Sequence, residues 1–254
     1  MKSYQDAYGR QVFDYLNGRK DVAEIVERDD GFFGVSAGAK YYFAPYREWH
    51  GREKKAIRYV RGRVLDIGCG AGRVSLYLQK KGFDVTGADA SPLGVRVCKM
   101  RGLKKASVLP ITKVSFKLGK FDTLTMFGNG FGLFGNPKRA KWMLKRFYKM
   151  TTNDARIIAE SLDPYKTDHP DHRIYHNYNK RRGRMAGQVR IRVRYRKYVT
   201  PWFDYLLVSP QEMRSMLKGT EWEMKHTLNS PSGAYIAIIE KTRRSTRPHG
   251  ERAG

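Results

Sequence analysis

The sequence predicts an α/β fold in which helices cover both faces of a mostly parallel β-sheet. Two observations carry this prediction: short apolar stretches alternate with amphipathic stretches from residue 63 to residue 160, and a glycine-rich turn follows the first of them. A third is a pair of apolar stretches near the end of the chain, separated by a polar turn. Alternation at this spacing requires crossover connections, which place helices on both faces of one sheet.

The N-terminal region is predicted to be largely helical. Residues 4–27 carry apolar side chains at intervals of four, and Gly18 separates a main helix from a second short helical turn over residues 22–26. Residues 31–46 are rich in glycine and aromatic side chains, which favours an irregular segment lying over an apolar surface. Pro45 opens a helix that extends to about Val60, because proline is well tolerated in a first helical turn.

Strands and helices then alternate. The predicted strands are residues 63–67, 84–88, 106–109, 121–127 and 156–160. The predicted helices between them are residues 73–81, residues 92–100 and a third that starts at Pro137. A helix over residues 210–217 and a hairpin of residues 222–228 and 234–240 complete the predicted sheet.

The regular pattern is interrupted after residue 160. Residues 162–186 are polar without a clear period, and Pro170 argues against a continuous helix there. Residues 188–199 alternate strictly, which predicts one strand with an apolar face and a cationic face. The cationic face consists of Arg190, Arg192, Arg194 and Arg196.

These four arginines are the sharpest indication of a substrate in this segment. Like charges so close repel one another unless an anion lies against them, so an RNA backbone, an acidic protein or a phosphorylated small molecule fits this face. The alternative is the solvated face of an edge strand, where charge prevents aggregation. A basic stripe of Lys138, Lys141, Lys145 and Lys149 is expected to be a solvated helix surface.

Composition limits the class of protein. The 254 residues contain 41% apolar side chains and carry a net charge of +26, which makes nucleic acid a natural partner. No apolar run is long enough to span a bilayer, and the N-terminus lacks the apolar core of a signal peptide. The two cysteines, Cys69 and Cys98, provide no disulfide or zinc framework. We therefore expect a basic cytoplasmic protein with no membrane contact.

The glycine-rich turn predicts a cofactor site. Gly68, Gly70 and Gly72 follow the strand that ends at Asp66-Ile67, and Asp89 ends the next strand. Glycines let the backbone approach a ligand closely, and an acidic residue at the second strand tip can accept hydrogen bonds from ribose hydroxyls. The spacing differs from dinucleotide-binding and P-loop motifs. A carboxylate beside the loop favours a cation over a pyrophosphate, and S-adenosylmethionine is cationic and has no phosphate.

The run from Val64 to Asp89 resembles motifs I and II of the class I S-adenosylmethionine-dependent methyltransferases. The resemblance implies a Rossmann-like sheet of seven strands with an antiparallel last strand, and in-line methyl transfer that needs no metal. It implies that Asp66 lies beneath the ammonium group, that Asp89 binds the ribose and that Ala90 flanks the adenine. The residues expected to bind the cofactor are Asp66, Gly68, Cys69, Gly70, Gly72, Asp89, Ala90, Leu109 and Asn129.

The resemblance does not identify the acceptor or a catalytic residue. We expect a small-molecule or metabolite acceptor, with RNA (tRNA or rRNA) as the alternative and a non-catalytic cofactor-binding module as the second alternative. A general base is needed only if the acceptor arrives protonated. Candidates after the fifth predicted strand are Glu160, Asp163, Asp168, His169, His172 and His176.

The predicted organisation is a single domain in five parts. We expect the aromatic segment to form a lid over the site, because sequence before motif I often does so in this family. The parts are 1–60 (N-terminal helices and aromatic lid), 61–161 (cofactor-binding core), 162–202 (basic substrate-recognition insertion), 203–242 (rest of the core sheet) and 243–254 (basic tail, expected to be disordered).

Overall fold

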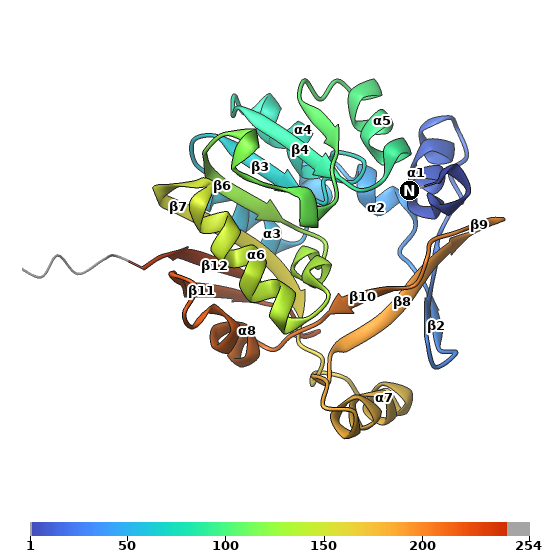
Figure 1. Cartoon of the computed structure of the whole chain (residues 1–254). Helices are drawn as coiled ribbons and strands as arrows, with labels where there is room; N and C mark the ends of the chain where they lie inside the picture. The colour runs from blue at the N-terminus through green and yellow to red at the C-terminus, as the bar shows by residue number, and fades with distance from the viewer. Residues whose placement is uncertain (1, 243–254) are drawn as a thin grey trace, which may run out of the picture.

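The computed structural model describes residues 2–242, which form two β-sheets surrounded by helices (Figure 1). The larger sheet has the strand order β11-β12-β7-β6-β3-β4-β5 and is the predicted seven-stranded sheet. The predicted tail, residues 243–254, lies outside the described residues. The strands are β3 Val64–Ile67, β4 Val85–Asp89, β5 Ala106–Val108, β6 Phe121–Met126, β7 Thr151–Leu162, β11 Trp222–Asn229 and β12 Ala234–Lys241.

Five neighbouring strands of the large sheet run parallel, in the order β7-β6-β3-β4-β5, so their carboxyl ends lie together. β3 pairs with β4 and β6, β4 pairs with β5, and β6 pairs with β7, all in parallel. β12 runs antiparallel to β7 and to β11, as predicted. All four residues of β3 are buried, which is typical of a parallel strand covered on both faces. The segments that follow β3, β4 and β6 therefore meet at one edge of the sheet.

Helices cover both faces of this sheet. α3 and α4 contribute to an apolar cluster on one face, and α6 and α8 contribute to a larger cluster on the other. Ile157 and Ile158 on β7 point into opposite clusters, so the two cores are separated by the sheet. The helices of this layer arrangement are α3 Gly51–Ala56, α4 Arg73–Lys80, α5 Pro92–Met100, α6 Pro137–Lys149 and α8 Pro210–Leu217.

The second sheet is antiparallel and was not predicted from the sequence. Its order is β10-β8-β1-β2, with β9 paired to β8. Figure 1 shows it beside the edge where the parallel strands end, next to α1 (Ala7–Leu16) and α2 (Ala39–Phe43). Its strands are β1 Ile25–Arg28, β2 Phe33–Val35, β8 Gln188–Tyr195, β9 Tyr198–Val199 and β10 Phe203–Leu206.

Two predictions within this sheet were wrong. Residues 22–26 were predicted as a helical turn, but Ile25 and Val26 belong to β1, where they pair with β2 and β8. Branched side chains of this kind pack well on a pleated surface, so the long-range pairing overrides the local helical spacing. Residues 188–199 were predicted as one strand, but Arg196 has a φ of 52° and forms a turn between β8 and β9.

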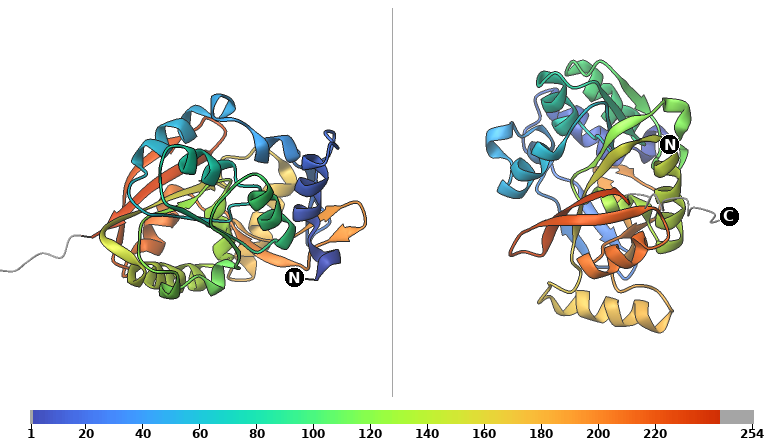
Figure 2. Two further views of the ribbon diagram at one scale, coloured as in Figure 1. Left: turned by 90° about the horizontal axis from the view of Figure 1, so that it is seen from above. Right: turned by 90° about the vertical axis from the view of Figure 1, so that its left-hand side faces the viewer.

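The prediction of no continuous helix in residues 162–186 was also wrong. α7 (Pro170–Arg181) starts with its proline in the first turn, where the missing N–H has no helical partner to lose. Its buried residues, Tyr175 and Asn179, are four positions apart. Figure 1 and the right view of Figure 2 both place α7 at the end of the molecule away from α4 and α5.

The helix predicted from Pro45 to Val60 consists of three short pieces. Tyr46–Glu48 and Ile57–Tyr59 are 3₁₀ helices on either side of α3, and the backbone is extended at Trp49 and His50. The Trp49 side chain is buried in the apolar cluster on the sheet, and this packing holds the extended backbone between the first 3₁₀ helix and α3. Glu53 then caps α3 by accepting a hydrogen bond from the His50 backbone N–H at 2.9 Å. Within residues 2–242, none of the helices is long and apolar enough to cross a membrane.

Candidate cofactor and active site

The glycine loop between β3 and α4 has the backbone that the sequence predicts. Gly68, Gly70 and Gly72 have φ values of 73°, 57° and 85°, which side chains with a Cβ rarely adopt. At Gly70 the space is also closed, because a Cβ there would overlap the hydroxyl of Tyr8. The Gly68 N–H donates to the carbonyl of Ala88 at 2.8 Å, so the loop is held against the end of β4.

Asp89 lies at the tip of β4, beside this loop, as predicted. Its Oδ2 accepts a hydrogen bond from the Gly70 N–H at 2.8 Å, and its Oδ1 accepts one from the Ser91 N–H at 2.8 Å. Burial raises the pKa of Asp89 to about 6, although the two backbone donors favour the ionised form. Asp89 therefore connects the loop to the start of α5, and its charge is sensitive to mildly acidic pH.

Asp66 supports the loop from below. It is 3% exposed, and its two oxygens accept hydrogen bonds from the Ser75 hydroxyl of α4 and the Thr125 hydroxyl of β6, the latter at 2.8 Å. Burial raises the pKa of Asp66, and the two hydroxyl donors partly oppose this effect. Asp66 thus ties β3, α4 and β6 together beneath the predicted position of the ammonium group.

Cys69, Ala90 and Leu109 complete the predicted lining near β4 and β5. Cys69 is buried with its Sγ 3.9 Å from that of Cys98, and the contact with Cys98 together with burial raises the pKa of its thiol. Ala90 is half-buried directly after Asp89. The Leu109 N–H donates to the Asp89 carbonyl at 2.7 Å, so all these segments converge at the same edge.

The segment after β6 adds Asn129, whose backbone is in the left-handed region with a φ of 58°. Its carbonyl accepts a hydrogen bond from the hydroxyl of Tyr205 on β10 at 2.6 Å. Its side-chain Oδ1 is buried and has no hydrogen-bond partner within residues 2–242. A buried acceptor without a donor is costly, and a ligand with donor groups would satisfy it.

Glu160 lies at the same edge, near the end of β7. Its Oε2 accepts from the Gly128 N–H at 2.7 Å, and its Oε1 accepts from Arg52 at 2.9 Å. Glu160 is 3% exposed, so this ion pair is almost free of water. Both carboxylate oxygens are already engaged. Glu160, although a candidate base, therefore has a positioning role: it holds the loop after β6 in place by accepting the hydrogen bond from Gly128.

The N-terminal segment covers the glycine loop through residues that the sequence analysis did not single out. Asp6 accepts hydrogen bonds from the Ser91 hydroxyl at 2.7 Å and the Leu93 N–H at 2.9 Å. Tyr8 lies over Gly70 and packs edge-on against Tyr42 of α2, with ring centroids 4.9 Å apart. The only sequence signal for this contact was Asp6, an aspartate placed directly before a helix with aromatic side chains such as Tyr8 on one face.

A second covering contact involves the first residue of α4. Arg73 donates to the hydroxyl of Tyr41 at 3.1 Å and to the carboxylate of Glu53, and its guanidinium lies over the rings of Tyr41 and Trp49. The aromatic segment that we expected to form a lid therefore contacts the first residue of α4 through Tyr41, and it packs on Tyr8, which covers the loop, through Tyr42.

The four arginines of the predicted cationic face do not line this edge. Residues opposite each other in an antiparallel pair share a face, and Tyr205 pairs with Val189, so the side of β8 toward Asn129 is the apolar one. Arg190, Arg192 and Arg194 project from the opposite face of β8.

Carboxylates of the neighbouring strands, which neither interpretation of this face included, offset part of its charge. Glu27 of β1 accepts two hydrogen bonds from Arg192, at 2.8 and 2.9 Å, and one from Arg194 at 3.1 Å. Asp204 of β10 lies 3.8 Å from Arg190. The neighbouring strands thus supply carboxylates that no pattern within residues 188–199 could reveal. Arg196 lies in the turn and not in the row.

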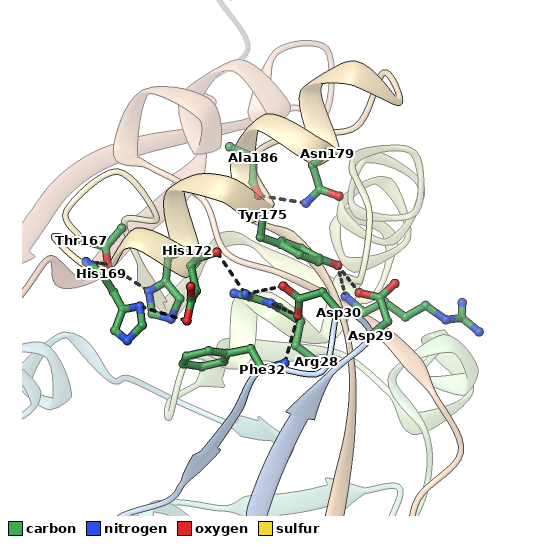
Figure 3. A network of polar contacts seen from close by, with 12 residues as sticks. Arg28, Asp29, Asp30, Phe32, Thr167, His169, His172, Tyr175, Asn179 and Ala186 are labelled. Atoms are coloured by element: carbon green, nitrogen blue, oxygen red, sulfur yellow. Dashed lines mark hydrogen bonds and ion pairs between the residues drawn. The ribbon is translucent and has the colours of Figure 1, made fainter.

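Two of the remaining candidate bases, His169 and His172, lie at the start of α7. Figure 3 shows His169 and His172 beside Phe32 and the Arg28–Asp30 ion pair, where α7 meets the β1–β2 turn. Burial and the Arg28 guanidinium lower the pKa of His172, and its Nδ1 is 2.9 Å from the Thr167 hydroxyl. This cluster anchors α7 and is separate from the glycine loop.

The other three candidates, His176, Asp163 and Asp168, make their side-chain contacts outside the glycine loop. Burial lowers the pKa of His176, Asp163 accepts from the Tyr165 N–H, and Asp168 is exposed and paired with Arg173. No group of three potential metal ligands occurs within residues 2–242.

The loop, the acidic residue at the tip of β4 and the sheet order together define a class I fold for S-adenosylmethionine. In agreement, residues 64–154 match the sequence model of a methyltransferase domain family. The match and the fold support a class I S-adenosylmethionine-dependent methyltransferase domain in this chain, and S-adenosylmethionine is the cofactor that the site fits. The carboxylate oxygens of Asp89 are suitable acceptors for the ribose hydroxyls of this cofactor. The Asn129 Oδ1, which has no partner within the described residues, is a suitable acceptor for the ammonium group of its amino-acid part.

Individual relatives agree with this assignment. A putative methyltransferase of Geobacillus sp. (strain WCH70) is 28% identical over 138 residues, which cover 50% of this chain and 54% of that protein. The chain thus matches about half the length of that relative.

Two solved structures share the fold. A methyltransferase from Bacteroides fragilis in complex with S-adenosyl-L-homocysteine has a TM-score of 0.81 at 23% identity, covering 95% of this chain and 97% of that one. The CcbJ methyltransferase from Streptomyces caelestis has a TM-score of 0.61 at 14% identity, covering 94% and 99%.

Proposed function

We propose that this protein transfers the methyl group of S-adenosylmethionine to a small-molecule acceptor bound over the ends of β6 and β7. The observation that carries the proposal is the cover over this edge. Tyr205 of β10 donates to the Asn129 carbonyl, and its ring leaves no room for a Cβ at Gly132. Tyr41 of α2 approaches from the other side through Arg73. A small acceptor fits beneath such a cover more readily than a base within folded RNA.

The bound cofactor supplies an activated methyl group on a sulfonium. The chain's own contribution is then to align the two reactants and to exclude water, which accounts for much of the rate of such a displacement. Asp89 would hold the ribose hydroxyls of the bound cofactor, and Glu160 holds the Gly128 backbone beside the proposed acceptor position.

The tyrosine hydroxyls near this position orient the acceptor. Burial raises the pKa values of Tyr41 and Tyr205 well above that of a free phenol. Both hydroxyls therefore remain protonated at neutral pH and donate or accept hydrogen bonds without acting as bases. An acceptor with a free lone pair at neutral pH suits this set of groups.

RNA is the second candidate acceptor, favoured by the net charge of +26. The names of two relatives indicate different acceptors, an rRNA in one case and a small molecule in the other. A 23S rRNA (uracil(747)-C(5))-methyltransferase of Pyrococcus abyssi is 33% identical over 106 residues, covering 41% of this chain and 24% of that protein. A 2-heptyl-1-hydroxyquinolin-4(1H)-one methyltransferase of Mycobacteroides abscessus is 32% identical over 73 residues, covering 29% and 30%.

The test is methyl transfer from S-[methyl-³H]adenosylmethionine into a cell extract that is then separated into small-molecule, RNA and protein fractions. We expect label in the small-molecule fraction. Label in RNA alone would replace the proposal with the second candidate. Calorimetric binding of S-adenosylhomocysteine without transfer to any fraction would indicate a cofactor-binding module.

A pair of variants connects the labelling to the covered edge. Tyr205→Phe removes the hydrogen bond to Asn129 and keeps the ring, so the transfer rate should fall about 2- to 10-fold, as expected for one hydrogen bond. The matched control is Tyr178→Phe on α7, where the exposed side chain is remote from the loop. Equal rates for both variants would contradict the assigned acceptor position.

A further inference from the structure

We infer that the outer surface of α6, together with the segment before β6, binds a single-stranded nucleic acid. We call this surface the α6 face. It comprises two exposed aromatic side chains, Phe116 and Trp142, and seven exposed lysines: Lys113, Lys117, Lys120, Lys138, Lys141, Lys145 and Lys149.

The helix places its cations in one row. Lys138, Lys141, Lys145 and Lys149 follow each other at intervals of three and four residues, so they share one side of α6. The buried residues of the helix, such as Met143 and Phe147, lie on the opposite side against the sheet. In Figure 1, α6 is on the side of the sheet that faces the viewer. The 3₁₀ helix Phe116–Leu118 contacts α6 and extends the surface.

These lysines carry uncompensated charge, unlike the arginines of β8. No lysine of the α6 face forms an ion pair with another residue of the described range 2–242. The only acidic residue between positions 110 and 150 is Asp122, which accepts hydrogen bonds from the Arg63 N–H and the Thr152 hydroxyl. An unpaired row of this kind attracts a polyanion by releasing its counterions.

The aromatic side chains indicate which polyanion. Trp142 is 49% exposed and Phe116 is 65% exposed, although large apolar side chains usually lie inside. The Arg146 guanidinium lies 5.1 Å from the centre of the Trp142 ring and holds the indole at the surface. Exposed aromatic rings among cations stack with unpaired bases, which an acidic protein does not offer. Single-stranded nucleic acid matches both the charge and the rings.

This surface lies on the flank of the sheet and not at the edge that carries the glycine loop. It goes beyond the proposed function, because nucleic acid bound here is independent of the acceptor that the site methylates. A small-molecule product in the labelling experiment would leave the inference intact.

The experiment measures binding of the full-length chain to a fluorescein-labelled 20-nucleotide oligouridylate by fluorescence anisotropy at several salt concentrations. We expect affinity to fall steeply with salt. Trp142→Ala should weaken binding about 5- to 100-fold, the range for losing one stacked base, and Trp142→Phe should restore most of it. The double variant Lys141→Gln/Lys145→Gln should lower the slope of log K against log salt by about 1.4, since each single-strand phosphate contact contributes about 0.7.

The control is Lys80→Gln/Lys81→Gln at the end of α4, which removes the same charge from the opposite face of the sheet. This pair should leave the affinity nearly unchanged. Equal losses from both lysine pairs would overturn the inference, because they would indicate attraction by net charge alone. A loss from the α6 lysines with none from Trp142→Ala would also overturn it, because the surface would then attract any polyanion by charge without stacking on unpaired bases. Circular dichroism of each variant verifies folding.

Discussion

Cofactor affinity should depend on pH through Asp89. The carboxylate must be ionised to accept hydrogen bonds from both ribose hydroxyls, and burial raises its pKa to about 6 in the cofactor-free protein. Lowering the pH through this value protonates Asp89 and removes the acceptor. The affinity for S-adenosylhomocysteine should therefore be highest at neutral pH and decrease as the solution becomes acidic.

The size of the effect follows from the pKa. At pH 7 about nine-tenths of the Asp89 carboxyl is ionised, and at pH 5 about one-tenth is, so the dissociation constant should rise about tenfold, or about 1.4 kcal/mol. An aspartate with the ordinary pKa of about 3.9 would change the constant by less than about 10% over the same range. Isothermal titration calorimetry at half-unit pH steps resolves the two cases.

Two variants isolate Asp89 from other titrating groups. Asp89→Asn should bind weakly at all pH values, because it loses charge-assisted hydrogen bonds worth about 1.5–3 kcal/mol each, and its pH step should vanish. Asp154→Asn removes an exposed carboxylate elsewhere and should keep the full step. A flat affinity between pH 7 and pH 5 in the unmodified protein would refute the assignment of Asp89 to the ribose.

Two further variants test the supports of the site, and a third tests the anchor of α7. Gly70→Ala should abolish calorimetric cofactor binding, because it forces a side chain into a left-handed backbone and onto Tyr8; normal binding would mean that the loop rearranges freely. Ser75→Ala should lower the free energy of unfolding by about 1–3 kcal/mol, measured by urea denaturation, because it deprives buried Asp66 of a donor. Arg28→Met should speed amide hydrogen exchange throughout α7 without changing cofactor affinity, and unchanged exchange would show that other contacts hold this helix.

The parallel sheet was predictable because its signals are local. The strands from β3 to β6 and the second half of β7 are short stretches with apolar side chains, and proline or an N-cap residue marks the start of α5, α6 and α8. The second sheet was missed because its strands come from residues 25–35 and 188–206, which are far apart in the chain. The alternation of residues 188–199 indicated a strand but not its partners, and residues 25–35 carry no comparable local signal. Their pairing exists only in the folded protein.

The residues of the candidate site also fall into those with a local sequence signal and those placed only by long-range contacts. Asp66, the three glycines and Asp89 could be assigned from spacing, because one loop between adjacent strands places them together. Tyr8, Tyr41 and Tyr205 could not, since they reach Gly70, Arg73 and Asn129 from elements whose positions depend on the whole fold. Aromatic richness before the first core strand was the sole sequence signal for the cover, and it did not indicate which rings make contact.

The two basic segments show why charge in a sequence is a weak guide to binding. The arginines of β8 form the denser pattern, yet Glu27 and Asp204 neutralise much of it from neighbouring strands. The lysines of α6 have the ordinary spacing of a solvated helix, yet their neighbours supply no carboxylate within the described residues. β8 lies between β1 and β10, and both neighbours place a carboxylate beside its arginines, whereas no ion pair is formed by the α6 lysines within the described residues. This difference in pairing is the physical reason for expecting polyanion binding at α6 before β8.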